Sequence, residues 1–429
     1  MFDPYFILIA ASLLIGISYL YDIISQKTKI PTVLLLIFTG ILLKYLGPSI
    51  GFNVPAFEKE IQGALELLGI IGLIVIVLEA ALDLNLTEGK FPVIGKSLFL
   101  ALIILVVTSM GIAITIMVFL GEPFFNSLVY AIPMSVVSSA VLIPSVHTLD
   151  GKKREFLIYE STFSDIIGIM FFNFVVLREL GGRSTFEEIL LIIFSIALSF
   201  VLSYFLVYFF CRIQTHLKVF LMMALLALLY AIGKKLHLSS LMIILIFGIV
   251  MNNTKLFFRG ALSNMIVDTS EVKVCKDFKI ITAESAFIVR TFFFVTFGLS
   301  INLANLFNLQ VLLIGILIVF ILYFIRYIHF KLILRTNVFP EIFMAPRGLI
   351  TILLFYSIPQ VYLLSSFSVG ILFFVILATS IVMMIALIKT PDTEPLNPDA
   401  INIDYDPLRK TESPEGSYCV IPEEDKKQQ

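Results

Sequence analysis

Long apolar segments recur along this chain and restrict it to one kind of fold. Segments such as 98–120 and 189–210 are apolar on every helical face, and similar segments follow one another from residue 4 to residue 389. Strands of a membrane barrel would alternate apolar and polar residues over roughly ten positions, and these segments do not alternate. Charged residues make up only 14% of the sequence, whereas soluble domains carry about a quarter. We therefore predict an all-α protein that crosses the membrane many times.

Glycines, prolines and charge clusters divide the apolar region into thirteen predicted transmembrane helices. They cover residues 5–24, 30–46, 62–82, 96–120, 124–148, 154–177, 187–211, 217–233, 238–252, 280–301, 309–334, 339–359 and 363–389. Residues 1–389 are thus predicted to form the transmembrane domain. From Thr390 onward, six prolines and ten acidic against four basic residues predict a disordered cytoplasmic tail over 390–429.

Lysines and arginines of the loops predict the orientation, because such residues are retained on the cytoplasmic side. With the N-terminus outside, sixteen of them lie on the inner side before the tail and six on the outer side. An odd number of spans then places the C-terminus in the cytoplasm. We expect a multi-pass protein of the plasma or inner membrane, surrounded by lipid.

Several functions are disfavoured by what the sequence lacks. The 30 basic and 31 acidic residues include no basic block, so nucleic acid is not expected as a partner. Three cysteines and four histidines are scattered without metal-ligand or disulfide-framework spacing. Neither H-E-x-x-H nor G-x-S-x-G occurs, and no G-x-G-x-x-G is present. We therefore expect neither an enzyme nor a cofactor.

The two halves of the chain resemble each other. Residues 30–40 align with residues 238–248 at an offset of 208, and residues 81–85 align with residues 298–302 at an offset of 217. Both pairs lie seven predicted spans apart, and an odd separation inverts one repeat relative to the other across the membrane. Inverted repeats of this kind are typical of secondary transporters.

Two predicted spans in corresponding places carry helix-breaking residues. Span 124–148 has Pro133 and Pro144 around Ser138 and Ser139, and its repeat partner, span 339–359, has Pro346 and Pro359 around Arg347 and Gly348. Interrupted helices free carbonyl groups and helix ends to face an ion near the bilayer midplane. Ordinary proline kinks are the alternative interpretation.

Acidic residues inside the membrane need a function or a partner, because a carboxylate at the bilayer centre costs about 2.5–3.5 kcal/mol on insertion scales. Span 154–177 contains Glu160 near its start and Asp165 near its middle. At 100° per residue, Ser161 shares a face with Asp165, and Ser164 shares another with Glu160. Asp165 is our candidate for binding a proton and a monovalent cation in alternation, and Glu160 is expected to belong to an ion pair. The predicted ion site also includes four serines, Ser161, Ser164, Ser138 and Ser139.

The basic residues available to pair with these acids are Arg347 and Arg290, since arginine keeps its charge. Glu79 lies late in its span and either reaches the membrane interface or modulates the site. Arg326 lies near a predicted helix end, where extension of its side chain to the interface would suffice to explain it.

Several segments together resemble the monovalent cation–proton antiporter superfamily, nearest its sodium–proton exchanger (NhaP-like) branch. They cover nearly the whole membrane region in the order of that family. The segments are Lys29-Ile-Pro with Gly40-Ile-Leu, Leu78-Glu-Ala-Ala-Leu-Asp83, Glu160-Ser-x-x-Ser-Asp165, Ser239 with Phe247-Gly248, Arg290-Thr-Phe-Phe-Phe with Gly298-Leu-Ser, and Pro346-Arg-Gly348.

The resemblance implies an NhaA-like fold in which a core with two crossing broken helices moves against a dimerisation module. It implies that Asp165 binds Na⁺ or another monovalent cation in exchange for H⁺, within a homodimer. It also implies that Glu160 and Arg347 form the ion pair of the core and that Arg290 is a basic residue beside the crossing.

The chain departs from this family pattern at two places. Ser138 and Ser139 stand where the family usually has Thr-Asp, and Ser164 stands where it usually has Asn or Asp. Asp165 is thus the one acid left at the crossing. An electroneutral cation–proton antiporter is the leading hypothesis, and a non-transporting relative with a degenerate ion site is the alternative.

Overall fold

The computed structural model describes residues 4–47, 58–84, 86, 90–146, 149–181, 185–212, 218–235, 240–258, 269–306, 308–334 and 338–390. Helices dominate these residues, and no strand occurs among them. The α-helices are α1 (Pro4–Thr28), α2 (Thr32–Leu46), α3 (Glu58–Asp83), α4 (Phe91–Leu120), α5 (Phe124–Ser135), α6 (Ser139–Leu142), α7 (Gly151–Gly181), α8 (Thr185–Arg212), α9 (Lys218–Lys235), α10 (Ser240–Asn252), α11 (Thr254–Phe257), α12 (Thr269–Ser300), α13 (Leu303–Leu306), α14 (Leu309–Leu334), α15 (Leu349–Tyr356) and α16 (Val369–Lys389). The 3₁₀ turns are η4 (Ile143–Ser145), η6 (Glu341–Phe343) and η7 (Gln360–Tyr362).

Each of the thirteen predicted spans contains helical structure, and the all-α membrane fold is confirmed. Within the described ranges, six helical stretches are long and apolar enough to cross a membrane, and four further apolar stretches of helix have 10–17 residues. Part of the predicted loop 253–279 is helical, because α12 begins at Thr269 rather than at 280. Residues 391–429 of the predicted tail lie outside the described residues.

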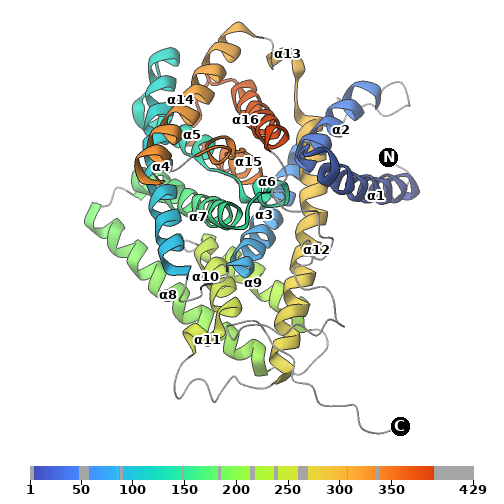
Figure 1. Cartoon of the computed structure of the whole chain (residues 1–429), viewed down its shortest axis with the longest axis vertical. Coiled ribbons are helices and arrows are strands. Elements are labelled where there is room, and N and C mark those ends of the chain that lie inside the picture. Colours follow the sequence, from blue (N-terminus) through green and yellow to red (C-terminus); the bar gives the residue numbers. More distant parts are fainter. Residues whose placement is uncertain are drawn as a thin grey trace.

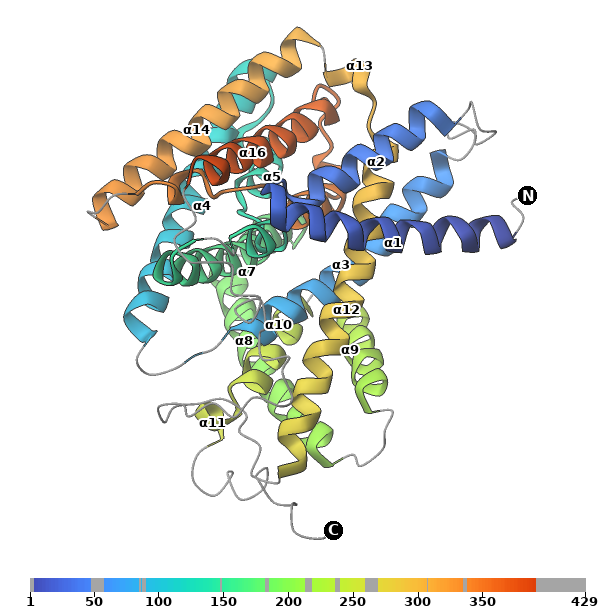
Figure 2. The same cartoon turned by 45° about the vertical axis from the view of Figure 1, so that its right-hand side comes forward.

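The helices form two groups that pack mainly within themselves (Figures 1 and 2). We call α1, α2, α3, α8, α9, α10 and α12 the scaffold module, in which α12 packs on α2 and α3, and α10 packs on α3, α8 and α9. We call α4–α7, α14, η6, α15 and α16 the core module, in which α4 packs on α5, α7 and α14, and α14 packs on α16. Smaller contacts join the modules, chiefly those of α15 with α3 and of α7 with α8.

Small residues at two helix crossings follow the predicted inverted repeat. A Cβ atom added to Gly40 of α2 would lie 2.2 Å from the carbonyl oxygen of Val295 and 2.8 Å from Cα of Gly298 in α12. A Cβ atom added to Gly248 of α10 would lie 2.5 Å from Cβ of Ala81 in α3. Gly248 and Gly40 are the aligned residues of the first repeat pair, and Ala81 and Gly298 those of the second. The crossing of α2 with α12 therefore has its counterpart in the crossing of α10 with α3.

Both proline-containing spans are interrupted as expected for crossing broken helices. α5 ends at Ser135, residues 136–138 leave the helical conformation, and α6 begins at Ser139. In the partner span η6 ends at Phe343, and α15 begins only at Leu349. Backbone groups freed in this way need partners inside the protein, because lipid offers none. These partners define the site described next.

Candidate functional site

The two interrupted helices meet at residues 136–138 and 344–348. The backbone N–H of Ser138 donates to the carbonyl oxygen of Pro346 at 2.9 Å. A Cβ atom at Gly348 would lie 2.7 Å from Ser138 Oγ and 2.5 Å from Val141 Cγ2, so this approach has room only for glycine. The Pro346-Arg-Gly348 segment is thus shaped to pass directly over the break between α5 and α6.

Asp165 of α7 reaches this crossing from the side. Its carboxylate oxygen Oδ2 accepts the backbone N–H of Ser139 at 3.0 Å and the Ser139 hydroxyl at 2.5 Å. The Asp165 residue is only 5% exposed. No cationic side chain forms an ion pair with it among the described residues. The described hydrogen bonds to this buried carboxylate therefore come from one residue, Ser139, through its hydroxyl and its backbone N–H.

Two oxygens at the crossing have no hydrogen-bond partner among the described residues. They are Oδ1 of Asp165 and the hydroxyl oxygen of Ser138, and both are buried. Buried polar groups in proteins normally have a hydrogen-bond partner, so two buried oxygens without one require an explanation. Carboxylate and hydroxyl oxygens are ligands suited to a hard cation. The arrangement can hold a dehydrated monovalent cation, or a proton on Asp165.

The other two predicted serines differ in their roles. Ser164 Oγ accepts the backbone N–H of Val137 at 2.9 Å, which satisfies one group freed by the break after α5. Ser161 Oγ instead donates to the carbonyl oxygen of Ile158 in its own helix at 3.2 Å. Although Ser161 shares a helical face with Asp165, no hydrogen bond between the two residues occurs in the described part of the chain.

Arg347 lies at the crossing, but its predicted pairing with Glu160 is not formed. Its guanidinium donates from Nε to Met134 O at 2.9 Å, from Nη2 to Ser135 O at 3.2 Å, and from Nη1 to Ala345 O. The carbonyl groups of Met134 and Ser135 belong to the last turn of α5, where the helix dipole favours a positive charge. Arg347 therefore stabilises the broken helix directly instead of neutralising a carboxylate.

Arg326 of α14 is the actual partner of Glu160. The Nη1–Oε1 distance is 2.6 Å and the Nη2–Oε2 distance is 2.9 Å, and both side chains are 1% exposed. The same guanidinium donates to the carbonyl oxygens of Glu341 and Met344. It also stacks 4.3 Å above the ring of Phe330. One arginine thus joins α7, α14 and the start of the second broken helix.

The position of Arg326 near a predicted helix end indicates a side chain at the membrane interface, and this prediction is wrong. Arg326 is 1% exposed, because η6 packs on α14 and Glu160 of α7 pairs with the guanidinium. One signal was present in the sequence: Arg326 lies eight residues before the predicted end of its span at 334, deeper than a single helical turn.

Glu79 and Arg290, the two predicted modulating charges, form an ion pair. Arg290 Nη2 of α12 lies 2.8 Å from Glu79 Oε2 of α3. Both residues belong to the scaffold module, and Arg290 also lines a pocket against α6. Arg290 is thus beside the crossing, and Glu79 neutralises it there.

No group of three or more His, Cys, Asp or Glu side chains suited to a resident metal ion occurs in the described part of the chain. The oxygen ligands that the described residues offer at the crossing come from serines, one aspartate and the backbone. This donor set suits a monovalent ion better than a transition metal.

Comparison with known proteins agrees with this architecture. The family model described as "Sodium/hydrogen exchanger, transmembrane" matches residues 9–389. Among solved structures, the sodium proton antiporter MjNhaP1 from Methanocaldococcus jannaschii at pH 8 superposes with a TM-score of 0.63 at 19% sequence identity, covering 90% of this chain and 99% of that one. A second structure of that antiporter, from an electron-microscopy map, gives 0.62 at 19% identity, covering 90% and 95%. No curated protein matches the sequence.

Proposed function

Because this chain belongs to the sodium/hydrogen exchanger family, we propose that it exchanges Na⁺, or else K⁺ or Li⁺, for H⁺ at Asp165. Membership makes it a multi-pass membrane transporter of the cation–proton antiport class and not an enzyme. The ions are its substrates, and it requires no cofactor.

One observation carries the assignment of the site. Asp165 Oδ1 and Ser138 Oγ are buried without partners at the meeting point of the two broken helices. Ser139 holds the other carboxylate oxygen in place. We assign Asp165 and Ser138 as side-chain ligands of the cation, Ser139 as the residue that orients the carboxylate, and Ser164 as support for the break. Ser161, with no described contact to Asp165, remains a peripheral part of the predicted set.

The two-module packing supports alternating access. In the described part of the chain every ion pair lies within one module: Glu160–Arg326, Lys153–Glu341 and Lys90–Glu155 in the core, and Glu79–Arg290 and Asp83–Lys279 in the scaffold. Relative motion of the modules would therefore break none of them. The core would carry Asp165 with its cation one way and with its proton the other way.

A single titrating carboxylate makes the cycle electroneutral. Asp165 would carry either one proton or one monovalent cation, so one positive charge crosses in each direction. Arg347 and Arg290 keep their charges throughout the cycle. No second acid is available at the crossing, since Ser138 and Ser139 occupy the break.

We place the N-terminus outside and the C-terminus in the cytoplasm, as the loop charges favour. We also propose a homodimer formed through the scaffold module, with residues 390–429 as a cytoplasmic tail. Cross-linking in native membranes tests the dimer: a monomer-sized product at every cross-linker concentration would contradict it.

Proteoliposomes test transport itself. The purified protein is reconstituted with an internal pH-sensitive dye, a pH gradient is imposed, and Na⁺, Li⁺, K⁺, Rb⁺ and choline are added in turn. We expect dissipation of the gradient with at least one alkali cation and none with choline. Dissipation by no cation, with the protein verified as folded, would instead support the non-transporting relative.

A further inference from the structure

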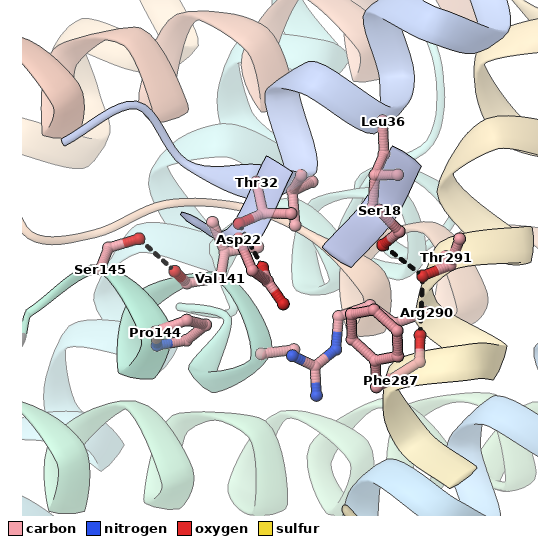
Figure 3. Close-up of a pocket in the computed structure, with 12 residues that line it drawn as sticks. Ser18, Asp22, Thr32, Leu36, Val141, Pro144, Ser145, Phe287, Arg290 and Thr291 are labelled. Carbon is pink, nitrogen blue, oxygen red and sulfur yellow. Dashed lines mark hydrogen bonds between the residues drawn. The ribbon is translucent and has the colours of Figure 1, made fainter. Parts of the chain in front are cut away.

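A pocket lies between the two modules, outside the ion site described above (Figure 3). Its scaffold wall includes Ser18, Asp22, Thr32 and Arg290 from α1, α2 and α12. Its core wall comes from α6 and η4, through Ala140, Val141, Pro144 and Ser145. Because its walls belong to different modules, the pocket must change shape when the modules move.

The pocket adjoins the ion site through α6. Ala140 and Val141 face the pocket, and the preceding residue, Ser139, donates to the carboxylate of Asp165. A group bound in the pocket would thus lie one short helix away from the proposed cation ligands. The pocket lies toward the end of α1 that leads into Lys27 and Lys29, the side that the loop charges assign to the cytoplasm.

Asp22 is the one acid among the residues that line the pocket. Its Oδ1 atom accepts the hydroxyl of Thr32 at 2.7 Å, and Figure 3 shows its side chain pointing into the pocket. No ion pair of Asp22 occurs among the described residues. The carboxylate is therefore available to bind an ion in the pocket.

Arg290 supplies the positive charge of the pocket, but Glu79 offsets it. The guanidinium is anchored to Glu79 at 2.8 Å, while its Nε atom is buried without a partner. Glu79, Arg290 and Asp22 together carry a net charge of −1 by simple addition of their formal charges. Within the lining itself Asp22 and Arg290 have opposite charges, but Glu79 pairs with Arg290 from outside the lining, so the charge left over is that of Asp22. In a low-dielectric surrounding such a negative charge attracts cations and repels anions.

We propose that Asp22 captures the transported cation in this pocket before the cation moves to Asp165. The inference rests on the proposed antiport function and adds an entry site to it. Asp22 would raise the local cation concentration and leave the binding step at the crossing unchanged. Its removal should therefore raise the KM for the cation without an equal loss of the maximal rate.

The first test compares Asp22→Asn with wild type in proteoliposomes over a range of concentrations of the best transported cation. Asn keeps an oxygen that can accept from Thr32, so the fold is retained while the charge is lost. We expect KM to rise about threefold to tenfold, as removal of one nearby charge implies, with Vmax within twofold. Asp22→Glu should restore most of the wild-type KM.

Asp83→Asn is the matched control for charge loss. Asp83 also lies in the scaffold module, but it pairs with Lys279 at 2.9 Å and does not line the pocket. Its KM should stay at the wild-type value. A KM for Asp22→Asn equal to wild type, or an equal rise in the control, would overturn the proposal.

A second test does not depend on transport. Ser145→Cys places a thiol in the pocket wall, in a background where Cys211, Cys275 and Cys419 are replaced by serine. We expect a cationic methanethiosulfonate to react faster than an anionic one, and Asp22→Asn to lower this ratio by at least about threefold. A ratio unchanged by Asp22→Asn would refute an uncompensated charge there, whatever the transport result. Wild-type liposomes without any exchange would refute the antiport function separately, while the thiol ratio would still decide whether Asp22 attracts cations.

Discussion

Arg326 of α14 holds both carboxylate oxygens of Glu160 of α7, at 2.6 and 2.9 Å, with both side chains buried. Glu160 lies five residues before Asp165 on the same helix, and Arg326 also donates to backbone carbonyls at the start of the second broken helix. The pair therefore fixes the helix that carries the proposed ion ligand to the segment that crosses it.

Breaking this ion pair should destabilise the core. Glu160→Ala or Arg326→Met leaves one buried charge uncompensated, which costs about 3–5 kcal/mol. We expect either variant to lower the melting temperature in detergent clearly, measured by intrinsic tyrosine fluorescence or by light scattering. Wild-type melting temperatures for both would contradict a structural role for the pair.

A double-mutant cycle distinguishes the two arginines. Glu160→Ala with Arg326→Met should show a coupling energy of about 0.5–3 kcal/mol, as expected for residues in direct contact. Glu160→Ala with Arg347→Met should show a smaller coupling, because Arg347 donates to backbone carbonyls and not to Glu160. A larger coupling energy with Arg347→Met than with Arg326→Met would instead support the Glu160–Arg347 ion pair expected from the sequence.

Asp165→Asn should abolish exchange and leave the fold intact. Asn keeps the volume and can still accept a hydrogen bond from Ser139, but it cannot bind a proton and a cation in alternation. The measurement is gradient dissipation in liposomes, paired with a melting curve to verify folding. Exchange at the wild-type rate in this variant would exclude Asp165 as the carrier.

Membrane voltage should not drive the exchange. Moving one net charge through 100 mV is worth about 2.3 kcal/mol, so an electrogenic cycle would respond strongly. The test imposes a potassium–valinomycin potential on liposomes and measures exchange of a transported cation other than potassium. A rate that changes or reverses with the potential would require a second titrating group, for which Glu79 would be the first to examine.

The helix crossing at Gly40 should tolerate no side chain. Gly40→Ala would place Cβ 2.2 Å from the carbonyl oxygen of Val295, so α2 and α12 would have to separate. We expect a loss of about 1–3 kcal/mol in stability, as in other overpacked sites. Gly16→Ala of α1 is the control, because nothing lies within 4 Å of the added Cβ atom. Equal melting temperatures for the two variants would show that the crossing is looser than described.

The sequence by itself determined the number of spans, their order and the places where two of them break. These are local properties: a run of apolar residues must form helix in lipid, and the first break lies between Pro133 and Pro144 while the second contains Pro346. The repeat was also visible, because the residues at its two crossings must be small for backbones to approach, as at Gly40 and Gly248. Serine and aspartate at the break likewise predicted the oxygens that meet there.

The partners of the charges were decided only by the tertiary structure. Arg290, Arg326 and Arg347 are equivalent as charges in the sequence, and a buried carboxylate accepts any of them. Arg326 pairs with Glu160 because the packing of α14 on α4, and of η6 on α14, brings it inward. Asp22 likewise lines the inter-module pocket only because helices far apart in the sequence pack together around it. Apolar runs are consecutive in the sequence and can be recognised there. The partner of a charged side chain, in contrast, depends on which helices become neighbours in the folded protein.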